Sequence, residues 1–114
     1  MWWQVLNQGG RENNYREQSA SAMFVYALRK ASRNGWLERD KYEPVARRGY
    51  QGITQLFVAV DAEGRVNING TCKVAGLGGN PYRDGSYDYY TKQTEVITND
   101  SKGVGAFILA SAEQ

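Results

Sequence analysis

The sequence predicts an all-α fold of layered helices, interrupted by one short β-hairpin-like segment and a long loop rich in glycine and tyrosine. Residues 18–33 and the residues after 101 are apolar on most sides, which is typical of helices surrounded by protein. Residues 40–60 are apolar on one face only, which indicates an outer helix. Two buried helices with an exposed helix between them suit concentric layers and fit a stand-alone domain of 114 residues poorly.

The composition is that of a folded globular protein, with 41% hydrophobic and 23% charged residues. The 14 basic and 12 acidic residues leave a net charge of +2, which is too small and too dispersed to indicate a nucleic-acid partner. The apolar stretches are shorter than the roughly 20 residues that a bilayer requires, so no membrane partner is expected.

The absence of histidine excludes histidine-based zinc sites and serine–histidine or cysteine–histidine nucleophile pairs. Cys72 is the only cysteine, so no intrachain disulfide can form and the cellular compartment stays open. The 8 tyrosines, 3 tryptophans and 13 glycines suit a polar cleft that stacks on a flat ligand. A core that uses tyrosine would have the same composition.

Apart from Gln4, the first six residues are large and apolar, and they lack the features of a secretory signal. Because domains usually begin in exposed polar segments, this start predicts a chain cut from something longer. Residues 7–14 are rich in glycine and asparagine and are expected to form a loop. A helix is expected at 18–33, because its apolar residues recur at helical spacing and Asn34-Gly35 suits its C-terminal end.

The second expected helix has a start signal of its own. Asp40 is placed to be its N-cap, with Glu43 at the capping-box position and Pro44 in the first turn. Its apolar stripe runs from Tyr42 to Val60.

The remainder of the chain predicts less regular structure. Residues 61–64 predict a turn, and residues 65–69 alternate like a short strand. Residues 70–92 are irregular by composition. The sequence Asn99-Asp100-Ser101 offers N-cap candidates for a last helix that runs to the end.

Two parts of the long loop could carry chemistry. The glycine-rich residues 76–80 lack the Lys-Ser/Thr pair of a phosphate-binding loop, and no helix follows, so a nucleotide site is not indicated. Residues 81–90 alternate tyrosines with hydrogen-bonding side chains, a combination that stacks on sugar rings and binds their hydroxyls. The same tyrosines could instead pack the loop onto its own scaffold.

Charged and polar residues at two helix starts are also informative. Glu17 complements the dipole of the first helix, and Ser19 or Ser21 suits a cap or a core hydroxyl. Lys102 opposes the dipole of the last helix, so an anionic ligand or a facing carboxylate is needed to explain its place. Spacing alone assigns no pair of catalytic carboxylates.

Five segments in order carry a family resemblance: residues 2–6, residues 15–28 with a tyrosine and a glutamate before a Ser-Ala-Ser helix, and residues 71–79, 82–90 and 99–107. Over nearly all 114 residues they resemble the C-terminal part of the unsaturated rhamnogalacturonyl hydrolases of glycoside hydrolase families 88 and 105. The resemblance implies that residues 1–114 are part of an (α/α)6 six-hairpin toroid, and an incomplete domain by themselves. The two buried helices would be inner and the amphipathic helix outer.

The resemblance implies removal of an unsaturated uronic acid from the non-reducing end of lyase-generated oligosaccharides, as in pectin degradation. The implied reaction is hydration of the C4–C5 double bond: an aspartic acid protonates C4, water adds at C5, and the hemiketal collapses. No metal or organic cofactor is implied. A bacterial cytoplasmic or periplasmic location is implied.

The resemblance places the catalytic aspartate, with the histidine and Arg-Trp residues near it, ahead of Trp2. No catalytic residue is therefore assigned in this chain, which is expected to be inactive alone. Trp3 and Tyr15 would offer apolar faces to the sugar, and Lys102 would face the uronate carboxylate. The residues expected to form one wall of the substrate cleft are Trp3, Tyr15, Glu17, Tyr82, Arg83, Asp84, Tyr87, Tyr90 and Lys102.

The same loop also suits a non-catalytic sugar-binding or assembly module, or a packing protein whose tyrosines form a partner interface. An incomplete toroid leaves the sides of its inner helices bare, and large apolar patches usually become interfaces. We therefore expect the chain to self-associate or to pair with the missing N-terminal half.

Overall fold

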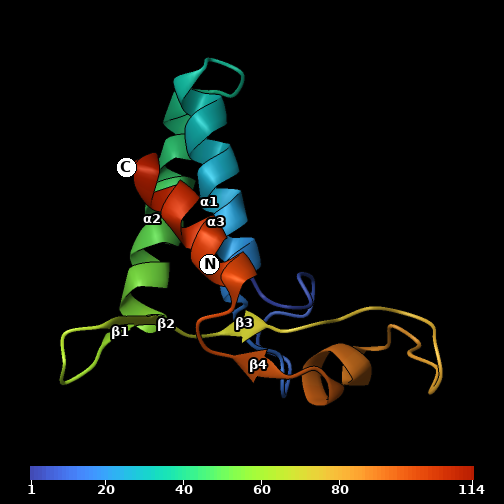
Figure 1. The fold of residues 1–114 in the computed structure, drawn as a ribbon. Helices are drawn as coiled ribbons and strands as arrows, with labels where there is room; N and C mark the ends of the chain where they lie inside the picture. The colour runs from blue at the N-terminus through green and yellow to red at the C-terminus, as the bar shows by residue number, and fades with distance from the viewer.

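The computed structural model describes residues 1–114, which form three α-helices, two small antiparallel sheets and a short π-helical turn (Figure 1). The helices lie together, and a long loop extends from the sheets to one side. The elements in chain order are α1 (Gln18–Arg33), α2 (Arg39–Leu56), β1 (Val58–Val60), β2 (Val66–Ile68), β3 (Thr71–Cys72), the π-helical turn (Tyr89–Gln93), β4 (Val96–Ile97) and α3 (Ser101–Ala112).

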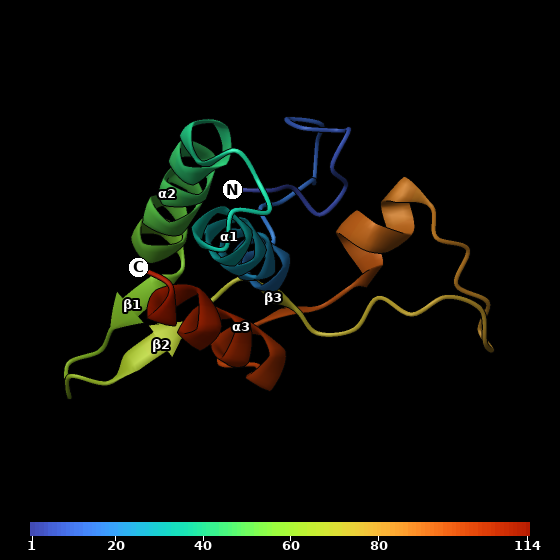
Figure 2. The same cartoon turned by 90° about the horizontal axis from the view of Figure 1, so that it is seen from above.

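The core lies where α1 packs against both α2 and α3 (Figure 2). Its small side chains let the helix backbones approach closely. At the contact of α1 with α2, Gly49 lies against Val25, and a Cβ added to Gly49 would be 2.7 Å from Val25 Cγ2. The buried side chains of the core are Ala22, Val25, Ile53, Ala106 and Ala110.

The first helix is confirmed with the predicted bounds. Its C-cap is Asn34, and Gly35 follows with φ +74°, as a C-terminal glycine signal requires. Within this chain, α2 and α3 cover only part of its surface. Met23 and Phe24 are 49% and 38% exposed, so the apolar side that predicted an inner helix is open here.

The second helix begins earlier than predicted. Its N-cap is Glu38 rather than Asp40, which lies in the first turn, and Glu38 makes no side-chain capping hydrogen bond. The predicted capping box is wrong, because Glu43 forms an ion pair of 2.9 Å with Arg29 of α1 instead. The prediction that Pro44 lies in the first turn is also wrong, because the earlier start makes it the sixth residue of the helix, where the Asp40 carbonyl lacks the hydrogen bond that an N–H at position 44 would donate.

The second helix also ends earlier than predicted, at Leu56 rather than Val60. Val58–Val60 forms β1, which pairs antiparallel with Val66–Ile68 in β2, so the predicted hairpin-like segment is confirmed and is longer than expected. β-Branched valines satisfy the apolar periodicity of a helix and a strand alike, and their restricted side chains favour the strand. Gly64 in the connecting turn has φ +80°, which only glycine adopts readily.

The second sheet was not predicted. Thr71 pairs with Ile97 and Cys72 pairs with Val96, so β3 and β4 close a 23-residue excursion, residues 73–95, which we call the tyrosine loop. The Lys73 N–H donates to the Glu95 carbonyl at 2.9 Å and extends this closure by one residue. Strands of two residues are too short to show alternation, so the sequence carries no signal for them.

The last helix is confirmed, with Asp100 as its N-cap. The Asp100 carboxylate accepts a hydrogen bond from the Lys102 N–H at 2.9 Å. α3 exposes Ile108 and Leu109, which are 60% and 50% accessible. None of the helices has both the length and the apolar character needed to cross a membrane.

Candidate functional site

The N-terminal segment, residues 1–17, lies against the tyrosine loop near the start of α1. The Tyr87 hydroxyl donates to the Glu12 carbonyl at 2.7 Å, and the Arg11 guanidinium lies 3.7 Å from the centre of the Tyr87 ring. The Tyr15 hydroxyl is 3.5 Å from Thr94 Oγ1 at the other end of the loop. Two segments more than 70 residues apart in sequence therefore form one face of the molecule.

A short backbone ladder positions Trp3 and Tyr15. Trp3 and Arg16 form an antiparallel bridge, and the Gln4 N–H donates to the Tyr15 carbonyl at 2.8 Å. The Arg16 guanidinium lies 3.9 Å from the centre of the Trp3 ring, so one face of this indole is already occupied by a cation. The other expected wall residue of the segment, Glu17, follows directly in sequence.

Glu17 is 3% exposed and caps α1. Its carboxylate accepts hydrogen bonds from the Ala20 N–H at 2.6 Å, from the Ser19 hydroxyl at 3.0 Å and from the Cys72 N–H at 2.9 Å. The expectation that Glu17 complements the dipole of this helix is confirmed. These donors occupy the carboxylate, so in this structure Glu17 holds β3 against the start of α1.

Tyr15 is half-buried beside Cys72 and Thr94. Burial raises the pKa of its phenol well above the ordinary value, and the neighbouring Cys72 and Glu17 add to the shift. The hydroxyl therefore keeps its proton at neutral pH. It can donate a hydrogen bond to a ligand oxygen, but it cannot act as a phenolate base.

The tip of the tyrosine loop packs on itself around Arg83. Gly78 and Arg83 form an antiparallel bridge, and Arg83 Nε donates to the Gly78 carbonyl at 2.8 Å. The Asp84 carboxylate accepts the Ser86 N–H at 2.9 Å, and this hydrogen bond lowers the pKa of Asp84 below its ordinary value. Tyr82 is 79% exposed and packs least of the loop tyrosines.

The other loop tyrosines divide between the two alternatives that the sequence left open. Tyr89 is buried and its hydroxyl donates to the Gly76 carbonyl, so it packs the loop onto itself. Tyr90 stacks edge-on against Tyr89 with 5.2 Å between ring centres. Tyr82 is the one that the chain leaves free to meet a ligand, and Tyr87 joins the loop to the N-terminal segment.

Lys102 lies at the root of the loop. Its ammonium group donates to Asp100 Oδ1 at 2.6 Å and to the Lys73 carbonyl at 2.9 Å. The facing carboxylate that could explain a cation in the first turn is therefore present. The same ammonium group lowers the pKa of Asp100 below its ordinary value. Lys73 is paired with Glu95 at 2.9 Å.

The expected wall residues thus do not surround an enclosed pocket, and Glu17 among them is buried. Trp3, Tyr15 and Glu17 gather at the start of α1, while Tyr82, Arg83 and Asp84 lie at the loop tip. The one hollow found in the chain is lined by none of them. No group of three or more Cys, Asp or Glu side chains is arranged to hold a metal ion.

Sequence reasoning missed the residues that hold this face together. Arg16 covers the Trp3 ring, Arg11 covers the Tyr87 ring, and Thr94 meets Tyr15. Arginines adjacent to aromatic-rich segments are a weak signal for such stacking. Nothing in the sequence pairs Thr94 with a residue 79 positions away.

Comparison with known proteins gives the family. The model of the family described as Glycosyl Hydrolase Family 88 matches residues 1–114. Protein Atu3128 of Agrobacterium fabrum and the 24.9 kDa protein in the picA locus of Rhizobium radiobacter are each 42% identical to this chain over 118 residues. These matches cover 99% of this chain and 50% of each relative, so the chain spans about half the length of the curated relatives it matches.

A solved structure agrees with this assignment. The glycoside hydrolase from family 105 of C. acetobutylicum ATCC 824 is 44% identical and superposes with a TM-score of 0.92. The match covers 98% of this chain and 31% of that structure, so the helices and loops described above correspond to part of a family 105 fold. By a family model that spans every residue, supported by these sequence and structure matches, this chain belongs to Glycosyl Hydrolase Family 88.

Proposed function

We propose that this chain supplies one wall of the substrate cleft of an unsaturated rhamnogalacturonyl or glucuronyl hydrolase that acts on lyase-generated oligosaccharides. The observation that carries the proposal is the tyrosine loop, which β3 and β4 hold at its root and which lies against the N-terminal segment beside the start of α1. In this proposal Trp3, Tyr15 and Tyr82 contribute aromatic rings to the wall. Aromatic faces flanked by hydrogen-bonding groups suit sugar rings.

The proposed reaction is hydration of the C4–C5 double bond of the uronic acid, in the course of pectin degradation. A general acid for this step needs a carboxyl group that is protonated at working pH. Asp84 and Asp100 have pKa values below the ordinary value because hydrogen bonds stabilise their charged forms, and Asp88 pairs with Lys92 at 3.0 Å. The lowered pKa values disfavour Asp84 and Asp100 in that role, and the proposal takes the acid from outside this chain, where the family resemblance puts it.

Lys102 is the proposed partner of the uronate carboxylate. Its side chain is 48% exposed at the root of the loop, and its ammonium group already binds one carboxylate, that of Asp100. A substrate carboxylate would share or replace this partner. A surface ion pair contributes little to stability, so exchanging its partner costs little.

The test is reconstitution. The matching segment is deleted from the C. acetobutylicum family 105 enzyme, and this chain is supplied in its place as a separate polypeptide. We expect the mixture to consume unsaturated uronides, followed as loss of their ultraviolet absorbance, while either part alone is inactive. The matched control supplies the deleted segment itself in the same way. If that control is active and this chain is not, the proposal is wrong.

A second candidate is a non-catalytic sugar-binding module, favoured by Tyr82, whose side chain is 79% exposed at the tip of the loop. In that case the chain alone would bind an unsaturated disaccharide with the affinity of the reconstituted mixture. Tyr82→Ala would weaken this binding, whereas Tyr42→Ala, on the outer helix, would not.

A further inference from the structure

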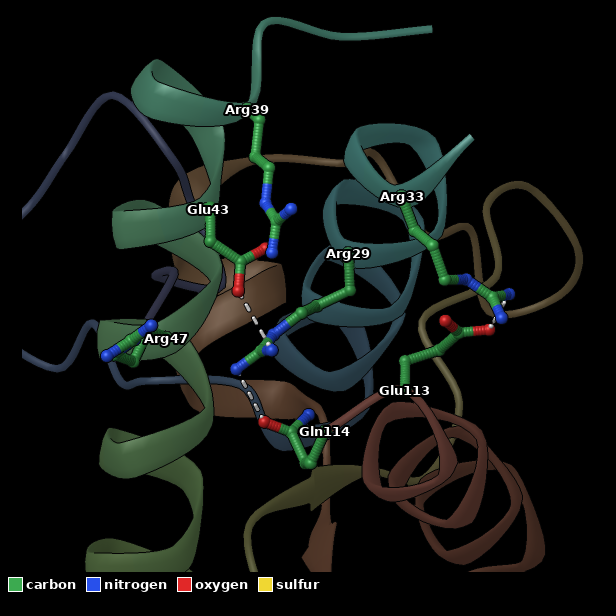
Figure 3. Close-up of a pocket in the computed structure, with 7 residues that line it drawn as sticks. All are labelled: Arg29, Arg33, Arg39, Glu43, Arg47, Glu113 and Gln114. Carbon is green, nitrogen blue, oxygen red and sulfur yellow. Dashed lines mark hydrogen bonds and ion pairs between the residues drawn. The ribbon is translucent and has the colours of Figure 1, made fainter. Parts of the chain in front are cut away.

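A hollow of about 400 Å³ lies at the end of α1 remote from the tyrosine loop (Figure 3). The last turns of α1, the first half of α2 and the end of α3 surround it, and no apolar side chain lines it. We call it the arginine hollow. Its lining residues are Arg29, Arg33, Arg39, Glu43, Arg47, Glu113 and Gln114.

The spacing of charged residues along α1 and α2 brings them together around the arginine hollow. Arg29 and Arg33 are four residues apart on α1, and Arg39, Glu43 and Arg47 are four apart on α2. Residues at this spacing lie on one face of a helix. The contact between α1 and α2 therefore turns two charged helix faces toward the same space, and Figure 3 shows Glu43 between Arg39 and Arg29.

The charges of the arginine hollow do not balance. Arg29 pairs with Glu43 and Arg33 pairs with Glu113, each at 2.9 Å. Arg39 and Arg47 form no ion pair within the chain. Four guanidinium groups therefore face two side-chain carboxylates, and those of Arg39 and Arg47 have no carboxylate partner.

Two further features add to the positive potential of the arginine hollow. Arg29 Nε is a buried donor that has no hydrogen-bond partner, although the two other nitrogens of the group bind Glu43 and Gln114. Buried donors are almost always paired, by protein or by a bound polar group. α2 also begins here with Arg39 in its first turn and without a side-chain cap, so two sources of positive potential coincide.

We propose that the arginine hollow binds a doubly charged oxyanion, either inorganic phosphate or a phosphate monoester. A dianion matches the two unpaired charges, and the planar fork of arginine suits phosphate oxygens. The lining offers no surface on which an apolar group could stack. A hollow of about 400 Å³ has room for a sugar attached to the phosphate. This proposal does not depend on the sugar-cleavage proposal above.

The test titrates the chain with inorganic phosphate, with glucose 6-phosphate and, as a monoanion control, with acetate, all at constant ionic strength. Phosphorus NMR of the ligand reports binding of both phosphates whatever the oligomeric state of the chain, and calorimetry reports acetate. We expect saturable binding of at least one phosphate ligand and none of acetate. Tighter binding of glucose 6-phosphate identifies a monoester as the ligand, and equal binding identifies phosphate itself.

Variants assign the binding to the arginine hollow. Arg39→Gln and Arg47→Gln are each expected to weaken phosphate binding by about tenfold, because each removes a charged hydrogen-bond donor. Arg65→Gln removes the same charge from the β1–β2 turn and is expected to leave binding unchanged. Arg39 and Arg47 are exposed and unpaired, so these variants keep the fold, which circular dichroism checks.

Two results would overturn the proposal. One is the absence of saturable phosphate binding to the folded chain. The other is an equal loss of affinity in Arg65→Gln and in the two hollow variants, because general charge attraction would then explain the binding.

Discussion

At the scale of single residues, Glu17 joins two distant parts of the chain. Its carboxylate caps α1 and at the same time accepts the Cys72 N–H of β3, 55 residues away. A helix-cap role could be anticipated from its place before an apolar helix. The bond to β3 could not, because nothing near Cys72 in the sequence indicates a strand.

Replacing Glu17 is expected to be costly. Glu17→Ala leaves the Cys72 N–H buried without an acceptor and uncaps α1, so the free energy of unfolding should fall by about 2 kcal/mol. Urea unfolding followed by circular dichroism measures this. Glu12→Ala, in the exposed N-terminal loop, is the matched control and should leave the midpoint unchanged. Equal midpoints for both variants would contradict the structural role of Glu17.

Tyr15 gives a prediction for alkaline pH. Burial raises the pKa of its phenol in the folded chain above the ordinary value of 10.0, so the folded state holds this proton more tightly than the unfolded state. The protonated phenol of Tyr15 therefore contributes fully to stability below pH 10. This contribution is lost as the pH rises toward the pKa that Tyr15 has in the folded chain. Tyr15→Phe should flatten the fall of stability above pH 10, measured as urea midpoints across that range. An unchanged slope would show that Tyr15 titrates normally.

At the scale of elements, the contact of α1 with α2 depends on a glycine. Gly49→Ala would bring a Cβ within 2.7 Å of Val25 Cγ2 and 3.1 Å of the Trp2 ring, so part of the core must shift. We expect a loss of about 1–2 kcal/mol in the free energy of unfolding. Gly105→Ala in α3 meets no atom within 4 Å and is the matched control. It should gain about 1 kcal/mol from helix propensity. Thermal unfolding of both variants gives the comparison, and the same sign for both would contradict the packing described here.

The elements also show where sequence reasoning succeeded. The helices were predictable because their apolar residues repeat at 3.6-residue spacing, and Asn34-Gly35 and Asp100 mark their ends. The sequence predicts helix at β1 because its valines fit both the helical and the strand period. The sheet of β3 and β4 and the contact of Tyr87 with Glu12 are products of long-range packing, which local patterns do not encode. The arginine hollow could not be predicted either, because it forms only where α1 and α2 pack side by side.

At the scale of the whole molecule, two apolar surfaces remain open. α1 exposes Met23 and Phe24, and α3 exposes Ile108 and Leu109. The match covers 31% of the family 105 structure, so this chain corresponds to about a third of that fold.

We therefore expect the chain to self-associate with increasing concentration. Replacing Phe24 and Ile108 with serine should shift the population toward monomer, because both substitutions remove exposed apolar area. Leu77→Ser removes an equally exposed apolar side chain from the tyrosine loop and serves as the control. Sedimentation velocity distinguishes the outcomes, and a monomer of the unmodified chain at high concentration would contradict the expectation.

The pairing of β3 with β4 determines what happens to the molecule when the tyrosine loop is cut. A protease that cleaves the tyrosine loop near Tyr82, which is highly exposed, would cut the chain into two polypeptides. The strand pairs at the root, the Lys73–Glu95 ion pair and the helix contacts would still join them. The severed pieces should migrate together under native conditions and separate only in denaturant.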